Sequence, residues 1–378
     1  MDAILLLILL AQNVIIKKLK SIVLFGNGFN KLLASLVRNY PEVNKPKDLK
    51  TDLATISNNI NDVAGLWERF KDAFPKIKRS HPNLCDEQIL CLLNELSNEE
   101  FFKEVIPKDK IEELAGRVDT ARKNSLREVA SDFKRFEDIS GNKVIRKLFP
   151  CFGIGFDNML NYNEVEELFI CTTNYDGILD TLLTSPVRIN GTNFIYPDCF
   201  GRSNIEGHLK LNEYMLRNVK RCMVHLHGSY KFTKRGSSTY KLTGDIFNEE
   251  PVLVFNNPFL KEKEILEDQV LSIYYRALTE RLKGYNRLVI IGNSFRNEPH
   301  LKELISQHFN RIGTEVIVCS LNPEEVANEL KDCYQKEIFQ FTTKSIENEK
   351  QLIDLLYHLF MPDIMNSNLC LNNRGLVA

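Results

Sequence analysis

Short apolar segments that end in polar or glycine-containing turns recur along the chain, and they constrain its fold more than any other feature. Nearly continuous hydrophobicity, as in 287–291, is typical of a parallel strand covered by helices on both faces. Longer segments with helical spacing separate these segments. The pattern predicts an α/β fold, a Rossmann-like parallel sheet with helices on both faces. The predicted strands occupy 21–25, 168–172, 222–226, 252–255, 287–291, 315–320 and 338–342.

The segment 41–149 has a different character, because strand-like runs disappear and apolar residues such as Ile89, Leu93 and Leu96 fall at helical spacing. We therefore expect a helical insertion subdomain at 41–149. The Rossmann domain would then consist of 21–40 and 150–378. The stretches 186–221 and 233–245 are predicted to be loop regions, the first because it is rich in Gly, Asn and Pro.

Charge and cysteine content exclude several classes of function. The chain of 378 residues carries 49 basic and 50 acidic side chains, so it has no global field that would attract nucleic acid or an anionic membrane. Contact with nucleic acid is expected only through a partner or a local patch. The nine cysteines are scattered and form no Cys-x-x-Cys pair. They are typical of buried thiols in a reducing cytoplasm, and neither a zinc ribbon nor any other metal site is predicted.

The N-terminal segment 1–20 contains an unbroken apolar run at 3–11. This run is well short of the roughly 20 residues that span a bilayer, and no basic stretch precedes it. We expect a packed helix or an oligomer contact. The alternatives are a membrane-associated anchor and a misassigned start.

A glycine turn follows the first predicted strand, at 25–30, and a helical pattern follows the turn. Glycines let the backbone approach a pyrophosphate, and the helix directs its free N–H groups at the anion. A purely structural turn is the alternative, since Lys31 stands where the complete G-x-G-x-x-G pattern requires glycine. The candidate cofactor-binding residues of this turn are Gly26, Asn27, Gly28 and Asn30.

Polar side chains also follow the second and third predicted strands. Thr173, Asn174 and Asp176 come after 168–172, where an amide side chain can hold a ribose hydroxyl or a water. His227 ends the third strand, and a neutral imidazole at that position suits a general base. The alternatives are a capped βα loop for the first group and a buried core histidine, which we favour for His225.

Two later strand ends complete the set. Gly292 and Ser294 follow 287–291, and Asn322 follows 315–320. Both turns are expected to form walls of a nucleotide site. Taken singly, Ser294 or Asn322 is equally consistent with a helix N-cap that satisfies backbone donors.

In order and context, G-x-G, T-x-N-x-D, L-H-G-S, G-x-S and a final strand that ends in Asn resemble the NAD-binding core of the sirtuin superfamily. The resemblance covers 21–30 and 167–323. It implies that Gly26 and Gly28 shape the pyrophosphate loop, and that Asn174 contacts the nicotinamide-side ribose and a water. It also implies that His227 is the catalytic histidine, while Asp176, Ser294 and Asn322 support the cofactor pocket.

The chain lacks two features of deacylating sirtuins, and their absence shows which branch of the superfamily it resembles. The paired cysteines of the sirtuin zinc ribbon are missing, and the longer arginine-bearing cofactor loop is not recognisable after Asn30. The pattern, including Tyr175, is closer to the sirtuin-like NADases of bacterial antiphage defence. This resemblance implies an NAD glycohydrolase that releases nicotinamide and ADP-ribose, with NAD as substrate. An NAD-dependent deacylase and a non-catalytic NAD or ADP-ribose sensing module are the rival functions.

Regulation is expected, because a cell cannot tolerate constitutive hydrolysis of NAD. The chain offers no obvious sensor domain, so self-assembly or a separate protein is the expected control. In its size the chain resembles the family members that are paired with a HerA-type hexameric ATPase. The resemblance therefore implies a homo-oligomer with such a partner.

Overall fold

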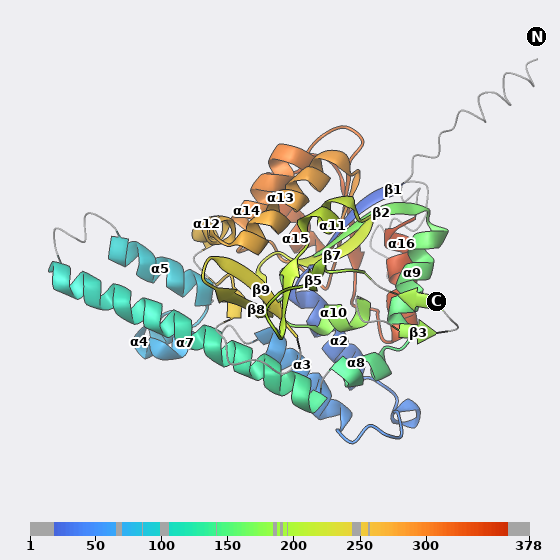
Figure 1. Cartoon of the computed structure of the whole chain (residues 1–378), viewed down its shortest axis with the longest axis horizontal. Coiled ribbons are helices and arrows are strands. Elements are labelled where there is room, and N and C mark those ends of the chain that lie inside the picture. The colour runs from blue at the N-terminus through green and yellow to red at the C-terminus, as the bar shows by residue number, and fades with distance from the viewer. Residues whose placement is uncertain are drawn as a thin grey trace, which may run out of the picture.

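The computed structural model describes residues 19–65, 70–84, 86–98, 106–140, 142–183, 187–189, 192–194, 196–243, 251–255 and 258–361. A six-stranded parallel sheet lies at its centre, in the order β13-β12-β11-β1-β2-β7 (Figure 1). Counted from β7, this is the 3-2-1-4-5-6 order of dinucleotide-binding folds, which reverses between β1 and β11. The predicted α/β fold is therefore confirmed. The strands are β1 (Leu19–Phe25), β2 (Val165–Thr172), β7 (Arg221–His225), β11 (Arg287–Ile291), β12 (Glu315–Ser320) and β13 (Ile338–Thr342).

Successive side chains of the parallel strands enter two different hydrophobic cores, one on each face of the sheet. In β11, Val289 and Ile291 belong to one core, whereas Leu288 and Ile290 belong to the other. This alternation follows from the two-residue period of a strand. Because both faces of the sheet are covered by packed side chains, the strands are nearly continuous apolar runs in the sequence.

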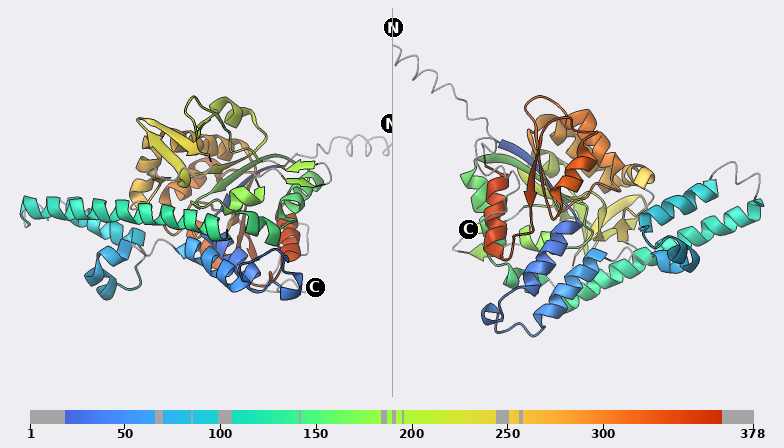
Figure 2. Two further views of the ribbon diagram at one scale, coloured as in Figure 1. Left: turned by 60° about the horizontal axis from the view of Figure 1, so that its bottom comes forward. Right: turned by 180° about the vertical axis from the view of Figure 1, so that it is seen from behind.

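Helices cover both faces of the sheet (Figures 1 and 2). Side chains of α2 (Asn27–Arg38), α9 (Phe152–Tyr162), α10 (Ile178–Leu183) and α16 (Glu349–Leu359) contribute to the first core. The second core receives side chains from α12 (Lys261–Glu267), α13 (Gln269–Gly284), α14 (Pro299–Leu304), the π-helical turn η5 (Ile305–Phe309) and α15 (Pro323–Leu330).

The described residues of 41–149 fold into helices. The longest is α7 (Lys108–Ser140), whose 33 residues correspond to a rod of about 50 Å. It extends past the sheet with α5 (Asp86–Asn98) beside its outer part (Figure 2). The other elements are η1 (Glu42–Asn44), α3 (Leu53–Gly65), η3 (Phe70–Ala73), α4 (Pro75–Ser80) and α8 (Asn142–Leu148).

A second, antiparallel sheet corrects two sequence predictions. The run 252–255 is not part of the parallel sheet, because β10 (Pro251–Leu253) pairs antiparallel with β8 (Gly228–Arg235). The stretches 186–221 and 233–245 are not simply loops. The short strands at 200–202, 208–211 and 238–242 are partly exposed, and a two-residue turn joins 228–235 to 238–242, which antiparallel pairing allows and parallel pairing does not. The remaining elements are β3 (Val187–Ile189), β4 (Thr192–Phe194), β5 (Phe200–Arg202), β6 (His208–Leu211), α11 (Glu213–Asn218), β9 (Ser238–Leu242) and η4 (Pro258–Leu260).

Most of the N-terminal segment 1–20, with its expected oligomer contact, lies outside the described residues, which begin at Leu19. Within the part of the chain that the structure describes, no helix combines the length and the apolar character that crossing a membrane requires.

Candidate functional site

The carboxyl ends of the parallel strands meet at one edge of the sheet, and their turns are bonded to one another. The amide of Thr173 donates to the carbonyl of Phe25 at 3.0 Å, which joins the β2 turn to the β1 turn. The amide of Gly28 donates to the carbonyl of Gly292 at 2.8 Å, which joins the β1 turn to the β11 turn. The second contact lies where the strand order reverses, which is the usual ligand site of open α/β sheets.

The glycines of these two turns are required by close packing of their backbones. Gly292 has φ +67°, and a Cβ atom placed on it would lie 2.3 Å from the nitrogen of Phe29. A Cβ atom on Gly28 would lie 2.8 Å from the Cα of Gly292. Side chains at either position would push the turns apart, so the sequence pattern of glycines reflects this contact directly.

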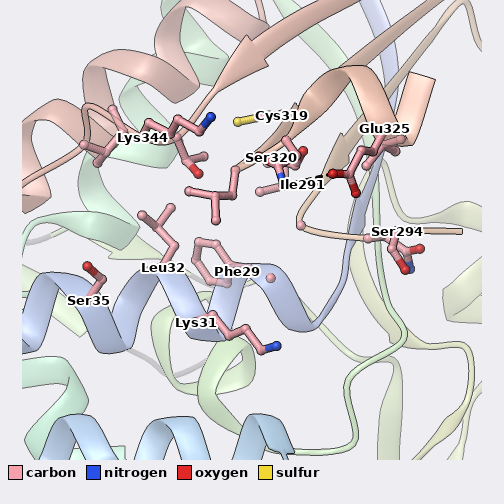
Figure 3. A pocket seen from close by; sticks show the side chains of 18 of the residues that line it. Phe29, Lys31, Leu32, Ser35, Ile291, Ser294, Cys319, Ser320, Glu325 and Lys344 are labelled. Atoms are coloured by element: carbon pink, nitrogen blue, oxygen red, sulfur yellow. Dashed lines mark hydrogen bonds between the residues drawn. The ribbon is translucent and has the colours of Figure 1, made fainter. Parts of the chain in front are cut away.

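A cavity of about 490 Å³ opens beside this contact, between α2 and the ends of β11, β12 and β13. Figure 3 shows Phe29 and Leu32 of α2 on one side and the strand ends on the other. Its volume lies within the roughly 300–1,000 Å³ of ligand sites. Four predicted cofactor residues line it, namely Gly28, Gly292, Ser294 and Asn322. Polar and charged lining side chains that the sequence did not single out are Lys31, Ser35, Asn293, Arg296, Ser320, Glu325, Thr343 and Lys344.

Asn174 lies at the neighbouring turn and is buried, with 6% of its surface exposed. Its side-chain amide donates to the carbonyl of Gly26 at 3.4 Å, and its backbone amide donates to the Thr172 hydroxyl at 3.0 Å. Asn293 connects this turn to the cavity, because its amide donates to the hydroxyl of Thr173 at 3.1 Å. Gly26, Thr173 and Asn174 are thus adjacent to the cavity, although they do not line it.

Asp176 and Asn30 are buried and bonded to each other, at 2.7 Å between Nδ2 and Oδ2. Asp176 also accepts from the amide of Ile178 at 2.9 Å, at the first turn of α10. The capped-loop alternative therefore describes Asp176 well. Asn27 begins α2. Asn322 occupies the N-cap position of α15 without a side-chain capping bond, and Asn293 rather than Ser294 closes the β11 turn by accepting from Phe295 at 2.9 Å.

His225 is a buried structural histidine, as expected. Its Nδ1 donates to the carbonyl of Asn174 at 3.1 Å, and its Nε2 donates to Asp180 at 2.7 Å. Burial alone would lower the pKa of His225, but the Asp180 carboxylate outweighs it and raises that pKa. The imidazolium is therefore favoured. Asp180 also pairs with Lys241 at 3.5 Å, so a charged network holds the backbone of Asn174.

His227 lies in the turn after β7, with 1% of its surface exposed. Its Nε2 lies 3.2 Å from Nε2 of His300 and 3.3 Å from Oε2 of Glu298. Burial and the Lys261 ammonium keep the pKa of His227 well below its ordinary value. Burial and the neighbouring His227 lower the pKa of His300 to about 3. Both rings are therefore neutral at physiological pH.

Glu298 and His300 were missed by sequence reasoning. They flank Pro299 at the start of α14, only seven and nine positions after β11 ends. Proline at the first helical position marks a helix start, and a helix that begins so soon after a strand begins at the ligand-binding edge. That signal, together with two ionisable side chains, identifies the segment.

Ion pairs of Lys261 hold the cluster of His227, Glu298 and His300 in place. The Nζ of Lys261 lies 3.1 Å from Oε1 of Glu298 and 2.7 Å from Oε1 of Glu87. Lys261 comes from α12 and Glu87 from α5, so the helical segment 41–149 contributes to the cluster. Lys261 leaves the other oxygen, Oε2, directed at the two histidines.

A scan against protein-family models finds no match for the chain, and a search of curated proteins finds none either.

Proposed function

We propose that the chain is an NAD glycohydrolase, which cleaves the bond between nicotinamide and ribose. The observation that carries the proposal is the cavity at the reversal of the strand order, together with Asn174 after β2, which is bonded to Gly26, and His227 after β7, the strand that pairs with β2. The resemblance of the five turn motifs to sirtuin-like NADases supports the same substrate.

The proposed pose follows from the shape of this edge. The adenosine end of NAD would occupy the cavity between α2 and the ends of β11 to β13. Its pyrophosphate would lie against Gly28 at the start of α2, where helix N–H groups and close backbone approach favour an anion. The nicotinamide ribose would extend past Gly26 toward Asn174, whose amide is bonded to the Gly26 carbonyl.

The reaction requires little acid catalysis, because the positively charged nicotinamide leaves as a neutral molecule. The protein must hold the ribose, exclude bulk water and orient one water at the anomeric carbon. In this reaction the side-chain amide of Asn174 binds a hydroxyl of the nicotinamide ribose and orients the attacking water. His227 accepts the proton, because a pKa well below its ordinary value leaves the ring neutral at pH 7, and a neutral imidazole carries a free lone pair.

The test is release of nicotinamide and ADP-ribose from NAD by the purified chain, measured by mass spectrometry. His227→Ala should lower the rate by about 10²–10⁴-fold, the usual contribution of a positioned proton-transfer group, and Asn174→Ala by about 10²–10³-fold, the usual cost of removing one positioned polar group. Asn218→Ala and His358→Ala, which lie on α11 and α16 away from the cavity, are the matched controls. Retained hydrolysis in either site variant refutes the assignment.

Two outcomes of the assay separate the rival functions. Acyl-ADP-ribose formed with an acylated peptide would identify a deacylase, and tight NAD binding without any product would identify a sensing module. The proposed biological setting is depletion of NAD in antiphage defence, in the cytoplasm and in complex with a HerA-type hexameric ATPase. Assay of the chain with and without that partner tests this setting.

A further inference from the structure

Three atoms that each carry a lone pair, from three different side chains, lie close together in the buried cluster around His227. Nε2 of His227 and Nε2 of His300 are 3.2 Å apart. Oε2 of Glu298 lies 3.3 Å from the first nitrogen and 3.7 Å from the second. A point equidistant from all three atoms lies about 2 Å from each, which matches the bonds of Zn²⁺ to imidazole nitrogen and carboxylate oxygen.

Hydrogen bonding alone does not satisfy this arrangement. Oε2 of Glu298 is buried and has no hydrogen-bond partner among the described residues. A neutral imidazole carries one N–H. If one ring donates its Nε2 proton to Nε2 of the other ring, the accepting ring has no proton for Oε2 of Glu298, and that oxygen faces a lone pair. A single cation at the centre would satisfy all three atoms together.

We propose that His227, Glu298 and His300 form a binding site for a first-row divalent cation such as Zn²⁺. Two imidazoles and one carboxylate are a donor set that such cations prefer, and three protein ligands leave a further coordination position.

The surroundings support a cation in charge and orientation. Lys261 holds Oε1 of Glu298, which fixes the carboxylate with Oε2 toward the histidines, as outer partners of metal ligands do. Glu87 and Glu298 outnumber Lys261 by one formal charge, so a divalent cation meets a negative environment.

Binding is tested without NAD. The full chain is stripped with a chelator and titrated with Zn²⁺ and with Co²⁺, whose absorption reports on its ligands. We expect one equivalent bound, with a Co²⁺ spectrum of nitrogen and oxygen ligation. His300→Gln and Glu298→Gln should each weaken binding by more than about tenfold, the lower end of the loss seen even for outer-shell partners. His358→Gln and Glu303→Gln should bind like the wild-type protein.

Several outcomes would overturn the proposal. These are absence of binding, unchanged affinity in both site variants, or thiolate-to-cobalt charge transfer that assigns the metal to cysteines. Zinc-edge X-ray absorption of the loaded wild-type protein needs no variant. It must show imidazole ligation without sulfur, even if a substitution prevents folding.

One consequence rests on the proposed function. A cation on Nε2 of His227 leaves the ring without a free lone pair, so metal binding and proton acceptance exclude each other. Zn²⁺ should therefore suppress nicotinamide release from wild-type protein, and a chelator should restore it. If no preparation hydrolyses NAD but Zn²⁺ binding depends on His300, the metal site stands and the proposed function fails.

Discussion

At the scale of single residues, the site depends on atoms that are held under constraint. The backbone turns at Gly28 and Gly292 touch, and two neutral histidines face a carboxylate. Adding a Cβ atom at Gly292 or protonating either histidine should therefore lower the free energy of unfolding by a measurable amount.

Gly292→Ala should destabilise the protein by roughly 1–3 kcal/mol, because alanine is strained at positive φ and its Cβ atom meets the Phe29 backbone. Gly116→Ala is the matched control. Gly116 is exposed within α7 and has open space around it, so alanine there should stabilise by about 0.5–1 kcal/mol. Urea denaturation measures both changes. Equal effects of the two substitutions would contradict the packing described for the turn.

His227 and His300 should make the metal-free protein sensitive to acid. Their pKa values are lower in the folded than in the unfolded state, so below pH 6.5 the unfolded chain binds more protons. Stability should therefore fall by up to about 1.4 kcal/mol per pH unit for each histidine below that pH. For His300 the loss continues down to a pH of about 3.

Denaturation curves between pH 8 and pH 5 measure this dependence. His300→Gln should reduce the slope below pH 6.5, and His358→Gln on α16 is the matched control. A slope unaltered by His300→Gln would show that the pKa of His300 is not depressed by folding.

At the scale of elements, a charged network joins α10, β7 and β9. Asp180 of α10 accepts from His225 and pairs with Lys241, and Lys241 also pairs with Asp198. Burial alone would raise the pKa of Asp180, but His225 and Lys241 outweigh it and hold that pKa below its ordinary value. The network bears on the proposed function because His225 holds the carbonyl of Asn174.

Asp180→Asn should cost about 3–5 kcal/mol, the usual effect of removing one member of a buried ion pair. Glu213→Gln is the control, since its pair with Arg217 is exposed and is worth at most about 1 kcal/mol. Thermal or urea unfolding compares them. A cost for Asp180→Asn no larger than that of Glu213→Gln would exclude a supporting role for the network.

At the scale of the whole molecule, the helical segment 41–149 is tied to the rest by ion pairs near the candidate site. Arg122 of α7 pairs with Glu264 at 3.1 Å, and Glu87 of α5 pairs with Lys261. Both partners belong to α12. The segment therefore contributes to the surroundings of His227.

Much of the parallel sheet was predictable, because strands buried on both faces leave continuous apolar runs. The bounds of β11, β12 and β13 agree with the prediction. The antiparallel sheet was not, since strands such as β6 are short and partly exposed and carry no such run. For the site, turns next to strand ends were found, whereas Glu298 and His300 lie beyond the turn, where the helix start at Pro299 is the one sequence signal that points to them.

The co-crystal structure of the His227→Ala variant with NAD tests the central claim most directly, because that variant should retain the substrate. We predict adenosine in the cavity between α2 and the ends of β11 to β13, with the nicotinamide ribose within hydrogen-bond distance of Asn174. NAD bound elsewhere, or bound with its nicotinamide end away from Asn174, would contradict the proposed site.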